Sequence, residues 1–148
     1  MSLRFLRPIL ASLALIGLPA VVLGSSAPTI VTPSQIHWSA AATMGPGVEM
    51  ATLLGNPAQS GPYVFRLRLR DGVTFPPHYH NDTERVTVLS GTLLVGLGDR
   101  IDRSHMTALP AGSIVSIPAG VHHYAIARGT TVLQLDGMGP FRMVTVRH

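Results

Sequence analysis

The sequence predicts an all-β fold, because three observations along the chain agree. From residue 48 onward, short runs rich in Val, Leu, Ile and Thr are separated by Gly, Pro, Asn and Asp. Within these runs, Phe65, Leu67 and Leu69 alternate with arginines, as on a strand with one buried and one solvated face. No segment after residue 28 has a helical period. About nine short strands in about 120 residues therefore predict an antiparallel sandwich or small barrel, in which closure removes exposed edges.

Each strand is expected where an apolar or alternating run lies between turn residues. Turn signals such as Asn81-Asp82-Thr83 and Pro118-Ala119-Gly120 divide these runs. With 148 residues, of which 46% are apolar, the chain can form one core of ordinary size. We expect strands near residues 48–54, 63–70, 74–80, 84–90, 92–98, 106–109, 113–117, 122–127, 131–137 and 141–147.

The N-terminus has the layout of a secretory signal peptide. Arg4 and Arg7 precede the apolar stretch 9–23, and small residues follow it, so that cleavage after Gly24 or Ala27 is expected. A retained membrane anchor is the alternative, although about 15 apolar residues are fewer than the 20 or so that span a bilayer. We therefore expect a periplasmic or secreted protein that touches a membrane only through an uncleaved signal segment.

The chain is thus expected to consist of a signal peptide at 1–27, an N-terminal arm at 28–47 and a β-barrel domain at 48–148. The arm is polar and rich in proline, and its bulky residues cluster around Trp38. We expect it to pack on the barrel or on a second subunit, which leaves a homodimer open.

Charge and cysteine content exclude two further classes. The formal net charge of +4 comes from arginines alone and falls to +2 without Arg4 and Arg7, since nine arginines then face seven acidic residues. A charge this small and scattered argues against a nucleic-acid partner. Because the chain has no cysteine, no disulfide can stabilise the exported fold and no lipid can be attached through one.

Four side chains of the metal-ligand type stand out: His78, His80, Glu84 and His123. His78 and His80 are two residues apart, so on a strand they leave the same face. Glu84 follows a turn that can fold its carboxylate back toward them, and His123 would come from a strand across the barrel. Three imidazoles and one carboxylate can hold a divalent transition metal and leave positions open for small ligands.

At these residues the chain resembles the cupin superfamily. The first cupin motif is met in full, and the second is met except that Ala127 stands where Asn is usual. The resemblance implies a small β-barrel, or jelly roll, with a metal bound by His78, His80, Glu84 and His123; the missing Asn puts the last turn in doubt more than the metal. The matching motif positions are Gly72, His78, His80, Glu84 and Gly91 in the first motif, and Gly112, Pro118, Gly120 and His123 in the second.

Each of these interpretations has a plainer alternative. The imidazoles and the carboxylate could satisfy one another by hydrogen bonds, without metal. His122 is adjacent to His123, and strand alternation should aim it away from the site. The charged segment 99–103 is expected to be a solvated hairpin loop, with His105 on the surface beyond it.

The sequence leaves the metal and the chemistry open. Zn, Cu, Fe, Mn, Co or Ni would suit these ligands, and affinity favours Cu and Zn. No twin arginine is present, so we expect the chain to be exported unfolded and to take up its metal outside the cytoplasm, which also favours Cu or Zn. A metal-binding protein is the first interpretation. A metal-dependent dioxygenase acting on a small organic substrate is the second, with Glu84 as ligand and proton acceptor. A non-catalytic small-ligand or metal sensor is the third. Side chains of the right type to line the cavity are Phe65, Leu67, Gln134, Met138 and Phe141.

Overall fold

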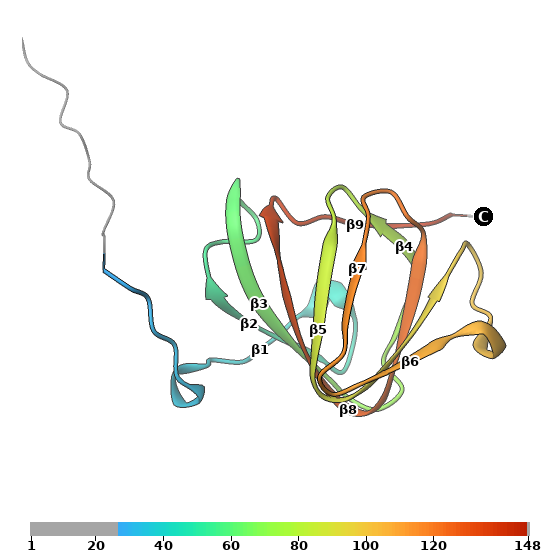
Figure 1. Ribbon diagram of the computed structural model, residues 1–148, viewed down its shortest axis with the longest axis horizontal. Coiled ribbons are helices and arrows are strands. Elements are labelled where there is room, and N and C mark those ends of the chain that lie inside the picture. Colours follow the sequence, from blue (N-terminus) through green and yellow to red (C-terminus); the bar gives the residue numbers. More distant parts are fainter. Residues whose placement is uncertain (1–26, 148) are drawn as a thin grey trace, which may run out of the picture. The chain divides into compact units, whose positions relative to one another are not determined.

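The structure, a computed structural model, describes residues 27–147, and its strands form the predicted all-β fold (Figure 1). The chain divides after Ile30, and the second unit, Val31–His148, contains every described strand. Three single 3-10 turns are also present: η1 Pro33–Gln35, η2 Ala42–Met44 and η3 Arg103–His105. The strands are β1 Ser39–Ala40, β2 Val48–Leu54, β3 Gly61–Leu69, β4 Thr74–His80, β5 Glu84–Leu97, β6 Thr107–Pro110, β7 Ile114–Ile117, β8 His123–Gly139 and β9 Met143–Thr145.

The predicted signal peptide lies, except for Ala27, outside the described residues. Among residues 27–147, no helix has the length and apolar character needed to cross a bilayer.

Two long strands, β5 and β8, organise the sheet. The sequence suggested two strands in each of these places, whereas the structure has one continuous strand in each. Gly91 in β5 and Gly129 in β8 have φ angles of 75° and 73°, which only glycine adopts without strain, and the register of the β5–β8 ladder shifts near Gly91. The glycines that looked like strand ends are therefore bends within strands.

The bends divide the sheet into two halves. The first part of β5 pairs with β7 and with the last part of β8, which also pairs with β3. The second part of β5 pairs with β6 and with the first part of β8, which also pairs with β4. All of these pairings are antiparallel, and the sheet curls around one interior (Figure 1). This arrangement brings residues that are far apart in sequence to opposite walls of one cavity.

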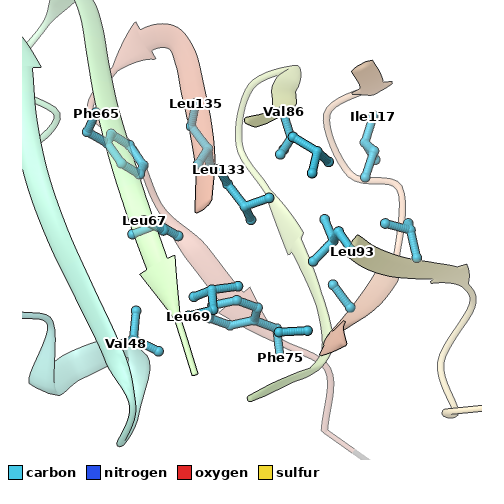
Figure 2. Close-up of a cluster of buried hydrophobic side chains, with 14 of the residues drawn as sticks. Val48, Phe65, Leu67, Leu69, Phe75, Val86, Leu93, Ile117, Leu133 and Leu135 are labelled. Atoms are coloured by element: carbon cyan, nitrogen blue, oxygen red, sulfur yellow. The ribbon is translucent and has the colours of Figure 1, made fainter. Parts of the chain in front are cut away.

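The interior is filled by the alternating residues of the strands. Phe65, Leu67 and Leu69 are buried, as their alternation predicted, and Figure 2 shows them on β3 with Leu133 and Leu135 on the neighbouring β8. Val86, Leu93 and Ile117 belong to the same core cluster. The opposite face of β3 carries Arg66 and Arg68.

The predicted arm contributes a short edge to this sheet. β1 pairs with β2, and Trp38 just before it lies against Arg68 of β3, with 4.6 Å from the guanidinium carbon to the ring centroid. The Arg68 guanidinium also contacts the Glu49 carboxylate at 2.7 Å. Residues 38–40 are thus held against the barrel of their own chain.

The bend at Gly91 is closely packed. A Cβ at this position would lie 2.5 Å from the Thr130 carbonyl oxygen and 2.6 Å from the Thr131 hydroxyl. That hydroxyl is fully buried and bonds across the bend to the backbone of Thr92, with distances of 3.1 Å to its oxygen and 3.3 Å to its nitrogen. Gly98 also has a positive φ, of 112°, but has nothing within 4 Å of the Cβ position.

We therefore expect Gly91→Ala to lower the free energy of unfolding by about 3 kcal/mol, because it combines backbone strain with a clash against backbone. Gly98→Ala, which adds strain without a clash, should lower it by about 1 kcal/mol. Urea denaturation of both variants measures the difference. Equal losses would show that the close packing at the bend does not matter.

Candidate metal centre

The structure brings the four predicted side chains together inside the barrel. His78 and His80 lie on β4, and His78 is the register partner of His123 at the start of β8. Glu84 is the first residue of β5, after the turn at 81–83. The three histidines are 4%, 5% and 2% exposed, and the Glu84 side chain is 10% exposed. The nitrogen atoms that the three imidazoles offer lie within 4.8 Å of one another.

Each imidazole is oriented by a hydrogen bond on its outer side. Nδ1 of His78 lies 2.6 Å from the carbonyl oxygen of Pro76, and Nδ1 of His80 lies 2.8 Å from that of Arg142. Nδ1 of His123 lies 3.0 Å from the carbonyl oxygen of Val121. Because a carbonyl oxygen can only accept, Nδ1 must be the donor in all three rings. A neutral ring then carries a bare lone pair on Nε2, the arrangement in which a histidine binds metal.

When the three rings are neutral, the inner atoms of the site are therefore all acceptors. Glu84 Oε1 lies 3.4 Å from Nε2 of His80, and Glu84 Oε2 lies 3.2 Å from Nε2 of His123. Both of these Nε2 atoms are buried and have no hydrogen-bond partner among the described residues. Buried lone pairs facing a carboxylate are unfavourable unless a cation lies among them.

The pKa shifts of the three histidines indicate the charge that the metal-free site would carry. Burial lowers the pKa of His78 to about 4, and burial also lowers the pKa of His80. Burial would lower the pKa of His123 as well, but the Glu84 carboxylate and the Val121 carbonyl outweigh it and raise this pKa.

Glu84 is the negative charge of the site. Burial raises its pKa, but the contact with His123 and the proximity of His80 and His78 outweigh burial, so that the pKa lies below the ordinary value. At neutral pH the site therefore combines one carboxylate with at least two neutral imidazoles, a set that attracts a cation.

Mutual hydrogen bonding explains this arrangement poorly. Every Nδ1 proton is directed outward. Because the pKa is lowered in His78 and His80 and raised only in His123, His123 is the one ring of the three that favours an additional proton. That proton could join His123 to Glu84, but it would leave the Nε2 atom of His80 unsatisfied. The residues fit a divalent transition metal better, because N and O donors with a fixed outer shell are what such ions require. Their assignment as ligands stays a prediction.

A cavity of about 40 Å³ adjoins the four side chains. Leu67 and Phe141 line it, as the sequence suggested. Phe65 and Met138 do not line it: Phe65 is fully buried in the core cluster, and Met138 is 51% exposed. The expectation that Gln134 faces the cavity is wrong, because it alternates with the cavity-lining Leu133 and Leu135 and accepts a hydrogen bond from Arg66 on the outer face.

Two methionines in the cavity wall were not identified from the sequence. Met44 lies at the end of η2 in the predicted arm, and Met143 begins β9. The arm has no strand period that could have shown which of its residues turn inward. For Met143, alternation in the short last strand was too weak a signal.

The neighbouring polar residues lie outside the cavity, as expected. His122 stacks on Tyr79, with ring centroids 5.0 Å apart, and its Nδ1 lies 2.6 Å from Asp99. His105 is exposed and pairs with Asp102 at 2.6 Å. His123, and not His122, therefore faces the cavity.

Ala127, which stands where the second cupin motif usually has Asn, is held by backbone hydrogen bonds to the segment before β4. The Ala127 nitrogen donates to the Val73 carbonyl at 2.9 Å, and the Ala127 carbonyl accepts from the Gly72 nitrogen at 3.0 Å. Backbone hydrogen bonds thus hold the turn without a side chain.

The fold of this chain is similar to that of several solved structures, a cupin among them. An RmlC-like cupin from Shewanella frigidimarina has a TM-score of 0.59 and 16% identity, over 82% of this chain and 95% of that one. The polyketide cyclase RemF from Streptomyces resistomycificus has a TM-score of 0.64 and 16% identity, over 82% and 89%. A salicylate 1,2-dioxygenase from Pseudoaminobacter salicylatoxidans, solved with gentisate, has a TM-score of 0.55 and 17% identity, over 67% and 29%. At these identities the likeness concerns the fold alone.

No curated protein matches the sequence. A family model does match: the one described as "Domain of unknown function (DUF4437)" covers residues 29–144, which is most of the chain and includes all four residues of the site. The chain has a cupin fold and three buried histidines that could hold a metal. Because the family model covers most of it, the chain belongs to the DUF4437 family.

Proposed function

We propose that this protein is an exported cupin that binds one divalent transition metal through His78, His80, Glu84 and His123. The observation that carries the proposal is the all-acceptor interior: three Nδ1 atoms donate outward to carbonyls, while unpartnered Nε2 atoms face a carboxylate. Export rests on the signal-peptide pattern of residues 1–27, and the mass of the mature protein would identify the cleavage site.

The bound ion would supply Lewis-acid chemistry to a small ligand at its open positions. The chain itself fixes the three rings, provides the negative charge of Glu84 and keeps the surroundings apolar, which strengthens electrostatic interactions there. Zn, Cu, Fe, Mn, Co and Ni remain candidates, and loading outside the cytoplasm favours Zn or Cu.

Mature protein from its native compartment should contain close to one equivalent of transition metal by elemental analysis. Iron or manganese near that level, without zinc or copper, would contradict the proposed loading route.

His123→Ala should weaken metal binding by about 100-fold or more, since even loss of an outer hydrogen-bond partner costs up to about that much. Glu84→Gln, which removes the charge, should weaken it by about tenfold or more. His122→Ala is the matched control, because this neighbouring ring contacts Tyr79 and Asp99 outside the cavity. Competition titration against a chromophoric chelator measures all three, and equal losses in His122→Ala and His123→Ala would refute the assignment.

Metal that binds only the folded state should also stabilise the fold. At a free metal concentration of about 100 times Kd, the gain is about 2.7 kcal/mol, which corresponds to a rise in Tm of roughly 10 °C. Thermal melts with metal and with chelator measure this rise. His78→Ala should melt at the same temperature in both, whereas a chelator effect that persists in this variant would place the metal elsewhere.

A metal-dependent dioxygenase is the second candidate. The observation that favours it is the apolar lining around the four side chains, which limits water at the site. In this case Glu84 would serve as ligand and as proton acceptor, because it is buried and ionised beside the cavity.

The enzyme hypothesis predicts oxygen consumption by metal-loaded protein with a small organic substrate, and its loss in Glu84→Gln and His123→Ala. Catechols and small thiols are the substrates to compare with an oxygen electrode. No turnover with iron, copper, manganese, cobalt or nickel would leave a binding role.

A further inference from the structure

The cavity beside the four ligand-type residues is small. The space open inside it is about 40 Å³. About 10–15 Å³ of such space holds one water, so the cavity holds a ligand of a few atoms and not an aromatic ring.

The chemistry of the wall points in the same direction. Among the described residues that line the cavity, every side chain other than the four ligand-type ones is aliphatic, aromatic or a thioether. An organic substrate with several polar groups would therefore find no hydrogen-bond partner there apart from the ligand set itself. Size and polarity together indicate that a ligand is held by the metal and by little else.

Met44 forms part of the wall between this cavity and the surface. Its side chain lines the cavity, and the same residue lines a surface groove of about 400 Å³ together with Pro46 and Arg70. Met44 packs against the core and is partly exposed. Met44 is thus the residue that the cavity and this groove share.

Met143 occupies a comparable place on another side, between the cavity and a groove lined by Tyr79 and His122. It is held by β9, where it is the register partner of His80. The backbone around Met44 bonds within its own turn, from Met44 to Ala41 at 2.8 Å and from Gly45 to Ala42 at 3.3 Å. Met44 thus lies in a single turn that Ala41 ties to Val48 at 3.0 Å, whereas Met143 is part of the sheet.

We propose that the metal cavity accepts only ligands of a few atoms and that Met44 sets this limit. The inference rests on the proposed metal site and defines its ligand class: small molecules or anions that bind the metal directly. A thioether is flexible and apolar, so Met44 closes the cavity toward the groove without offering a polar contact. Within the dioxygenase hypothesis, this limit disfavours catechols relative to small thiols.

The test uses Co(II)-loaded protein, because the visible bands of cobalt report directly on ligand binding. Azide, with three atoms, and catechol, with an aromatic ring, are titrated separately. Azide should perturb the bands of the wild type strongly and catechol weakly. In Met44→Ala, the affinity for catechol should rise by about tenfold or more, whereas the affinity for azide should change by less than about threefold.

Three further variants make the result specific. Met44→Leu keeps the apolar bulk and should resemble the wild type. Met50→Ala is the matched control, since Met50 also packs partly buried against the core but does not line the cavity. Met143→Ala tests the other wall and should raise catechol affinity less than Met44→Ala does.

The possible failures can be told apart. Absence of cobalt bands in the wild type would overturn the metal site and this inference together. Cobalt bands with equal catechol affinity in wild type and Met44→Ala would overturn the size limit alone. An equal or larger gain in Met50→Ala or Met143→Ala would overturn the role of Met44, and so would a Met44→Ala protein that retains cobalt and azide binding but still rejects catechol.

Discussion

The site depends on one constraint: the outer nitrogen of each buried imidazole donates to a backbone carbonyl. Pro76, Val121 and Arg142 provide these acceptors, and none of them needs a particular side chain to do so. The hydrogen bonds fix both the tautomer and the direction of each ring. As a result, the Nε2 lone pairs of the neutral rings point into the cavity beside the Glu84 carboxylate. A cation bound among them would stabilise this arrangement.

The barrel accommodates this set because its long strands bend. With the bend at Gly91, β5 places Glu84 near one end of its length and lets Leu93 and Val95 return to the same cavity from the other half. The buried Thr131 hydroxyl ties the two sides of the bend together. A polar site with few hydrogen-bond partners is thus surrounded by a rigid apolar interior.

Much of this arrangement could be predicted from the sequence. The spacing of His78 and His80 put them on one strand face, and alternation separated His123 from His122. Strand continuity through Gly91 could not be predicted, because a glycine with positive φ looks the same at a bend as at a turn. The inward turn of Met44 also depends on tertiary packing of a segment without periodicity. The outward direction of Gln134, in contrast, agrees with its alternation with Leu133 and Leu135 and with its register opposite Arg66.

The carbonyl that orients His80 has a further consequence for how the protein matures. It belongs to Arg142, in the segment just before β9, whereas His80 ends β4. During synthesis from the N-terminus, the three histidines and Glu84 all emerge before this acceptor does. The ring of His80 therefore stays free to rotate until the last strand docks, and a metal that meets the emerging chain meets an unfinished site. Completion of the proposed metal site is in this way coupled to completion of the fold.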